Sequence, residues 1–299
     1  MTQKIAVGEA IGAGFRLIGR EPMAFAVWCA AYFLLSALSL VLNWGDTAAY
    51  YDALAASVGG SAATLPAAPF GPAQWLAMLV SLVLVLTIYT AIMRAVLRPD
   101  DRRFFYLRLG MRELWVALSA VLATLLWFAG YLAFVLVIGI GVGGVAAAAG
   151  EAGAIVSVIM MLIVVPLALW AYVWASLRLS MATVMSFAEN RLRVLASWRF
   201  TKGHGLAMFL VGLALTVASL VVFGLLAGVM MGGLAAASPD RSNAFLAMLG
   251  QFSQMSVGAR LAYSAVISVL YVGFLVAFMA PWAEMYRQLR PTSVAATFD

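Results

Sequence analysis

Charged residues are scarce in this chain, and cysteine and histidine are almost absent. Asp, Glu, Lys and Arg make up 10% of the 299 residues, whereas a soluble domain carries about a quarter. Cys29 is the only cysteine, so an intramolecular disulfide is excluded. His204 is the only histidine, and a single histidine does not supply a multi-histidine zinc site.

Enzyme signatures are missing as well. The sequence contains no P-loop, no nucleophile elbow and no HExxH segment. A G-x-G-x-x-G match at residues 139–144 ends a long apolar run and has no βαβ unit around it, so it does not indicate a dinucleotide site. We therefore expect a protein that is not an enzyme and that holds no metal or cofactor.

Long apolar runs are abundant, because hydrophobic residues make up 65% of the chain. A water-soluble fold of this length cannot hide so much apolar surface, but a bilayer can solvate it. The sequence predicts an all-α integral membrane protein, a bundle of six transmembrane helices over residues 23–290. The expected spans are about 23–43, 73–97, 114–142, 154–177, 206–231 and 261–286, with loops between them that include one from Trp44 to Pro72.

Residues 1–22 predict a cytoplasmic interfacial segment, and residues 291–299 a cytoplasmic tail. In the first segment Val7, Ile11, Phe15 and Ile18 recur at helical spacing, which favours an amphipathic helix in the membrane interface. A frayed polar tail is the alternative.

The distribution of basic residues predicts the orientation. Of the 18 Lys and Arg residues, only Arg241 and Arg260 fall on one side of the predicted spans. Because cytoplasmic loops carry the excess of Lys and Arg, we expect both termini in the cytoplasm.

The longest basic segment runs from Arg178 to Gly205, between the fourth and fifth spans. We expect an interfacial helix there, because Leu192, Leu195 and Trp198 recur every three residues. Its basic residues, with Trp198 as an anchor, are predicted to contact anionic lipid headgroups: Arg191, Arg193, Arg199 and Lys202. The alternative is a purely topological role. Glu189 is expected to pair with Arg191 or Arg193, or to sit at a helix N-terminus.

Arg102 and Arg103 are predicted to lie at headgroup level too, because aromatic residues follow them between two spans. Such a mixture can also bind single-stranded nucleic acid, but the flanking spans favour lipid. In the fifth span, Gly224, Gly228 and Gly232 form a doubled G-x-x-x-G ladder that predicts close packing against another helix.

A faint repeat links the second and sixth spans. The second span ends with Ala-Ile-Met at 91–93, followed by Leu-Arg-Pro at 97–99. The sixth span ends with Ala-Glu-Met at 283–285, followed by Leu-Arg-Pro at 289–291. Three related hairpins would explain this repeat, and so would coincidence among common membrane-edge residues.

Two stretches of the central segment carry a family resemblance. Arg178-Leu179-Ser180-Met181-Ala182, then Glu189, then Ala196 to Gly203 (ASWRFTKG) resemble the pattern joining spans four and five in the membrane domain of some bacterial glycerophosphoryl diester phosphodiesterases. That domain also occurs alone, with unknown function. Thr183 and Val184 depart from the proline common after the first motif, and Ala196 replaces a common arginine. The resemblance implies a six-span fold in a bacterial inner membrane, without the phosphodiesterase activity, since the catalytic domain is absent from this sequence.

The predicted function is non-enzymatic: a lipid-contacting module or an accessory subunit of a membrane assembly, with lipids and a membrane protein as partners. The alternative is a transporter or flippase-like carrier of a hydrophobic or lipid substrate. A carrier of a soluble substrate is disfavoured, because the span interiors lack ionisable residues. A polar cavity open to one leaflet would favour a carrier, and an exposed apolar groove the accessory role.

Overall fold

All six apolar runs form long helices in the computed structural model of the chain, which describes residues 5–58, 71–140, 144, 150–237 and 256–290. No β-strand occurs in these residues, and six of their helices are long and apolar enough to cross a membrane. The long helices are α3 (Pro22–Val58), α4 (Pro72–Leu97), α5 (Met111–Ile138), α7 (Gly150–Leu179), α10 (Gly205–Ala237) and α12 (Val257–Leu289).

Short elements join or precede the long helices. They are α1 (Val7–Ile11), α2 (Ala13–Arg20), the 3-10 helix η1 (Arg103–Tyr106), α8 (Ala182–Glu189) and α9 (Val194–Phe200). Prolines mark several boundaries: Pro22 and Pro72 are first residues of helices, where a missing N–H costs nothing. Helix α4 ends at Leu97, shortly before Pro99, because a residue preceding proline avoids helical geometry.

The loop expected from Trp44 begins later than predicted, because α3 continues to Val58. The stretch from Asp46 to Val58 is rich in alanine, the best helix former, and the first Gly-Gly pair comes only at residues 59–60. The rest of that predicted loop, residues 59–70, lies outside the described residues.

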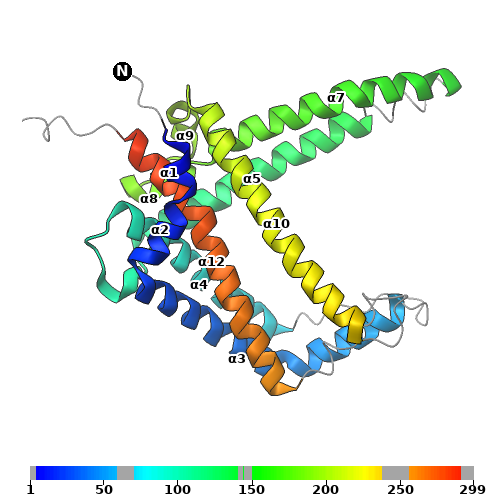
Figure 1. Cartoon of the computed structure of the whole chain (residues 1–299). Helices are drawn as coiled ribbons and strands as arrows, with labels where there is room; N and C mark the ends of the chain where they lie inside the picture. The colour runs from blue at the N-terminus through cyan, green and yellow to red at the C-terminus, as the bar shows by residue number, and fades with distance from the viewer. Residues whose placement is uncertain (1–4, 59–70, 141–143, 145–149, 238–255, 291–299) are drawn as a thin grey trace, which may run out of the picture.

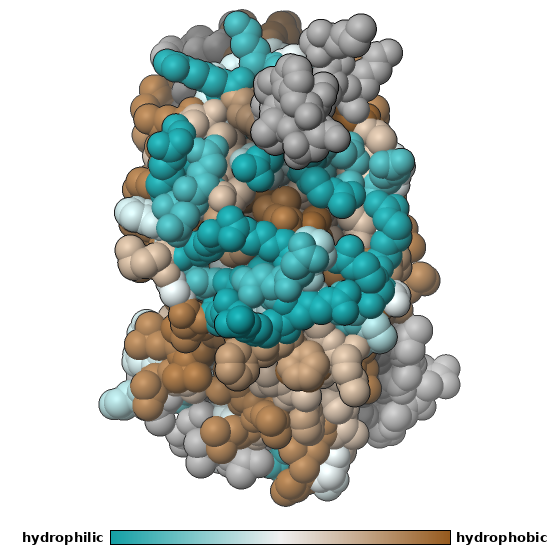
Figure 2. Space-filling view, turned by 90° about the vertical axis from the view of Figure 1, so that its left-hand side faces the viewer, coloured by the Kyte–Doolittle hydropathy of each residue, from teal (hydrophilic) through white to brown (hydrophobic). Residues whose placement is uncertain are grey.

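The buried core lies toward one end of the long helices. Buried side chains are concentrated in the second halves of α4 and α12, the first turns of α5 and α10, and α2, α8 and α9. Figure 1 shows these parts together at the upper left, and Figure 2, which views that side, shows hydrophilic side chains gathered above a hydrophobic zone. The basic segments of the chain thus lie at the well-packed end.

Helix α12 is the centre of this core and contacts α1, α2, α3, α4, α8 and α10. One cluster joins it to α2, α3 and α4 through Leu17, Trp28 and Ile92. A second cluster joins it to α5, α8 and α10 through Val116, Phe187 and Met208. The backbone N–H of Ala6 also donates to Oε1 of Gln288 at 2.9 Å, so the two ends of the described chain meet.

The apolar stripe predicted for the N-terminal helices packs against the core only in part: Val7, Ile11 and Ile18 are half-buried there, and Phe15 is not. Ala10, Ala13 and Leu17 are buried, whereas Phe15 of the expected apolar stripe is 73% exposed. Gly14 explains the difference, because a Cβ there would lie 2.8 Å from Cα of Ala277 in α12. Small side chains at Ala13 and Gly14 let α2 lie directly on the α12 backbone, with Leu17 buried in the same core and Phe15 turned away from it.

The six long helices do not pack against one another along their whole lengths. The hairpin of α5 and α7 diverges from α10 and α12 (Figure 1). No residue from Met161 to Leu179 is buried. Bilayer lipid is as apolar as these side chains, so no hydrophobic force requires the helices to close on each other.

Candidate functional site

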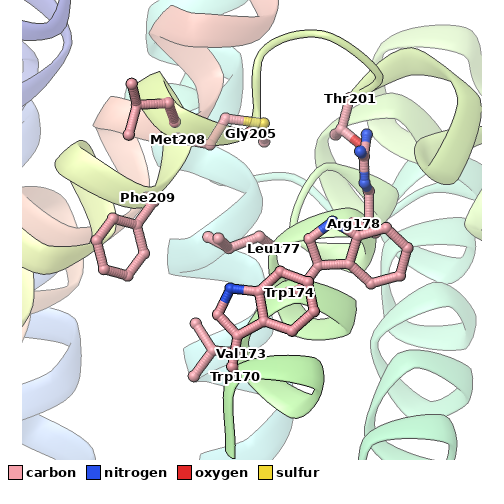
Figure 3. A pocket seen from close by; sticks show the side chains of 10 residues that line it. Trp170, Val173, Trp174, Leu177, Arg178, Thr201, Gly205, Met208 and Phe209 are labelled. Atoms are coloured by element: carbon pink, nitrogen blue, oxygen red, sulfur yellow. The ribbon is translucent and has the colours of Figure 1, made fainter. Parts of the chain in front are cut away.

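A pocket of about 510 Å³ lies where α7 and α10 meet (Figure 3). Its α7 wall carries Trp170, Trp174 and Leu177, and its α10 wall carries Leu206 and Phe209. Arg178 and Thr201 are its polar lining residues. The pocket is therefore an apolar hollow with a positive charge at one end.

Helical periodicity explains how α7 builds its wall. Trp174, Leu177 and Arg178 follow Trp170 by four, seven and eight residues, and such spacings place side chains on one face of a helix. Figure 3 shows this row facing Met208 and Phe209 of α10, with the Arg178 side chain directed toward Thr201.

Contacts between α7 and α9 fix the polar end of the pocket. The Arg178 guanidinium lies 5.1 Å from the Trp174 ring centroid, and its Nη1 donates to Oγ1 of Thr201 at 3.4 Å. Oγ of Ser197 donates to the carbonyl oxygen of Arg178 at 2.6 Å, and the Trp198 ring meets that of Trp174 edge-on at 4.9 Å. The guanidinium is therefore held in place while part of its donor set remains for a ligand.

These contacts bring together the two stretches that carry the family resemblance. Arg178 comes from the first stretch, and Ser197, Trp198 and Thr201 come from the second. The central segment thus closes one end of the pocket, which is a structural role that the sequence did not reveal.

Glu189 pairs with two of the predicted headgroup-binding arginines. Its Oε2 accepts from Nη2 of Arg191 at 3.0 Å and from Nε of Arg193 at 2.7 Å. The expected ion pair is thus confirmed, with both arginines rather than one. Asn190 turns the chain with a φ of 53°, which brings the arginines back toward the carboxylate. Both guanidiniums already have an anionic partner, so they are less available to lipid than Arg199 and Lys202.

The interfacial helix expected in the central segment is shorter than predicted. Helix α9 begins at Val194, so Leu192 precedes it, while Leu195 and Trp198 lie within it and are 78% and 41% exposed. The preceding helix α8 is buried in the protein and contacts α5. The sequence did not predict this burial, because it does not show which elements cover α8.

Arg102 and Arg103 lie on the exposed connection between α4 and α5. Nη2 of Arg102 contacts Oε1 of Glu21 at 2.9 Å, and Arg103 begins η1. Phe104, Phe105 and Tyr106 have positive φ angles, and Trp28 Nε1 donates to the Phe105 carbonyl at 2.9 Å. This turn leaves Phe104 78% exposed, at the same end as the arginines.

A buried ion pair beneath that turn was not predicted. Arg94 and Glu113 are only 4% and 3% exposed, and Nη2 of Arg94 donates to Oε1 of Glu113. Nη1 of Arg94 also donates to the Tyr106 carbonyl, and its guanidinium lies 5.6 Å from the Phe187 ring centroid. The sequence placed Arg94 near a span end but gave no sign of its partner 19 residues later.

The glycine ladder of α10 does not mediate a close approach in the described part of the chain. A Cβ added at Gly224 or Gly228 would meet no atom within 4 Å, and the surroundings of Gly232 are not described. The packing role therefore stays a prediction that would need a partner outside these residues.

The pocket suits binding better than bond-making chemistry, because its walls are aromatic and aliphatic and its one ionisable group is an arginine. In the residues that the structure describes, no three His, Cys, Asp or Glu side chains are grouped to hold a metal ion.

Comparison of the chain with protein-family models, curated proteins and solved structures found no match.

Proposed function

We propose that this protein is a non-enzymatic, multi-pass protein of the bacterial inner membrane that binds an anionic lipid between α7 and α10. It would serve as a lipid-contacting module or an accessory subunit of a membrane assembly. The observation that carries the proposal is the pocket of about 510 Å³ with aromatic walls and Arg178 at one end.

In this proposal, an acyl chain lies between Trp170 and Phe209, and the headgroup lies against Arg178. Lipid tails outside the pocket are equally apolar, so apolar burial alone would not select one lipid over another. Selection would come from the guanidinium, which can hold two phosphate oxygens at once, and from the fixed shape of the indole rings.

Filling the pocket tests the proposal. Gly205 lines it, and a Cβ there would meet nothing within 4 Å, so Gly205→Leu should occupy the hollow without displacing the backbone. Lipid retained by the purified protein would be identified by native mass spectrometry. We expect the variant to lose a bound anionic lipid and to keep its unfolding temperature.

Gly258→Leu is the matched control. Gly258 also lies in the first turn of a long helix with open space around it, but it does not line the pocket. Equal lipid retention by wild type, Gly205→Leu and Gly258→Leu would contradict a specific lipid in this pocket.

The carrier remains the alternative. The apolar lining of the pocket favours the lipid-contacting role, because a carrier that moves a headgroup across a bilayer needs a polar path for it. Accelerated lipid flipping by the protein in reconstituted vesicles would favour the carrier instead.

The proposed orientation places both termini in the cytoplasm, with α1, α2, α8 and α9 at the cytoplasmic leaflet and Phe15, which is 73% exposed, toward lipid. The distribution of Lys and Arg supports it. A phosphatase reporter fused after Asp299 should be inactive in cells, and an active fusion would overturn the topology.

A further inference from the structure

A second pocket, of about 350 Å³, lies between α2, α4 and α12 and is lined by three arginines. Arg16 and Arg20 come from α2, and Arg287 comes from α12. It lies at the well-packed end of the molecule but shares no lining residue with the pocket between α7 and α10.

One carboxylate lines the pocket beside these three positive charges, and a second, that of Glu21, has its Oε1 3.8 Å from Nε of Arg20. Glu284 is 4% exposed, and its Oε1 accepts from Nη2 of Arg287 at 2.8 Å and from Nε2 of Gln288 at 3.2 Å. The pocket lining therefore carries two more positive than negative charges. Like charges gathered in one hollow repel each other, and an anion between them would remove that repulsion.

Backbone contacts hold two of the arginines in place and leave donors for a ligand. Nη2 of Arg20 donates to the carbonyl oxygen of Ala95 at 2.6 Å, and Nη2 of Arg16 donates to that of Glu9. A guanidinium has five N–H donors, and these hydrogen bonds use one of them on each side chain.

The base of the pocket is apolar. Ala13, Leu17 and Val96 line it and are 5%, 3% and 7% exposed. This apolar base keeps water from one side of the guanidinium charges, while the side chains of Arg20 and Arg287, which are 44% and 59% exposed, face water on the other side. Arginine also matches the geometry of phosphate oxygens better than lysine does.

We infer that this pocket binds a phosphate group through Arg16, Arg20 and Arg287. The group could belong to a phospholipid or to a free phosphate ion, since both present the same oxygens. The inference is independent of the lipid proposed between α7 and α10.

The test uses the full-length protein in a neutral detergent, with inorganic phosphate and phosphatidic acid as probes. Phosphate binding would be measured by 31P NMR titration, and retention of phosphatidic acid by native mass spectrometry. Arg16→Gln should weaken binding about tenfold or more, the loss expected for one charge-assisted hydrogen bond. Arg98→Gln removes the same charge from an exposed residue that does not line the pocket and is the control.

The two probes separate the sources of the phosphate. Binding of inorganic phosphate that Arg16→Gln weakens identifies a site for a free phosphate group. Retention of phosphatidic acid alone, again lost in Arg16→Gln, identifies a lipid headgroup.

Folding is controlled by the unfolding temperature. If Arg16→Gln does not fold, Arg287→Lys keeps the charge beside Glu284, removes the guanidinium fork and should weaken the same probe. Binding of neither probe, or equal weakening by Arg98→Gln, would overturn the inference.

Discussion

Gly14 of α2 lies against Ala277 of α12 so closely that a Cβ on the glycine would come within 2.8 Å of the alanine Cα and 3.0 Å of the Val276 carbonyl oxygen. Backbone atoms cannot rotate away as a side chain can. We expect Gly14→Ala to lower the free energy of unfolding by about 1–3 kcal/mol, the cost of overpacking, measured by thermal unfolding in detergent.

Gly19→Ala in the same helix is the control, because a Cβ there would meet nothing within 4 Å. Alanine favours helix over glycine by about 1 kcal/mol, so this variant should be neutral or more stable. Equal behaviour of the two variants would show that α2 does not lie directly on α12.

The buried Arg94–Glu113 pair should be sensitive to the loss of one partner. Glu113→Gln removes the nearer carboxylate from a buried guanidinium, which keeps only Asp101, with Oδ2 3.8 Å from Nε of Arg94, and breaking a buried ion pair costs about 3–5 kcal/mol. Glu189→Gln breaks the pairs with Arg191 and Arg193, whose side chains are more exposed, and should cost less than about 1 kcal/mol. Similar unfolding temperatures for both variants would show that the buried Arg94–Glu113 pair stabilises the fold no more than the exposed pairs of Glu189 do.

Lipid contact by the central segment should depend mainly on Arg199, because Glu189 already pairs with Arg191 and Arg193. Changing Arg191, Arg193 and Arg199 to Lys keeps the charge but removes the guanidinium, which can hold two phosphate oxygens at once. We expect less anionic lipid in native mass spectra, with most of the loss reproduced by Arg199→Lys alone. If the triple variant retains as much anionic lipid as the wild type, the segment acts only as a topological signal.

Substitution of Gly228 should have no effect on stability, in contrast to substitution of Gly14. Because a Cβ there meets no atom within 4 Å, Gly228→Leu should leave the unfolding temperature of the isolated chain unchanged. A close helix contact would instead make it cost about 1–3 kcal/mol. A lower unfolding temperature together with loss of an oligomer would show that the ladder packs against a second copy.

The long helices and several of their ends were predictable, because each depends on local sequence. Apolar runs of sufficient length predict spans, and Pro22, Pro72 and Pro99 mark helix boundaries. The pairing of Glu189 followed from its neighbours within four residues. Such features need no knowledge of how distant segments meet.

The pockets and the buried pair were not predictable, because they join residues far apart in the chain. Trp170, Trp174 and Arg178 already shared a helical face in the sequence, but only the fold places Phe209 opposite them. The burial of α8 and the contact at Gly14 likewise depend on the elements that cover them. Glycine spacing favoured Gly228 over Gly14, because the sequence does not show which glycine has a neighbour.

The suggested repeat has a structural counterpart. Ala91 and Met93 in α4, and Ala283 and Met285 in α12, are all fully buried, and each helix ends at the leucine of its Leu-Arg-Pro sequence. This equivalence covers two segments in contact, whereas the relation among three hairpins stays a prediction.

The contact between Ala6 and Gln288, and the packing of α1 and α2 on α12, have a consequence for biosynthesis. A ribosome makes the first helices long before the last one, so the surface of α2 around Gly14 has no partner while the intervening helices enter the membrane. Completion of this core must wait for α12, as expected for contacts between residues far apart in the chain. A nascent chain truncated before α12 would therefore present an uncovered N-terminus to cellular proteases.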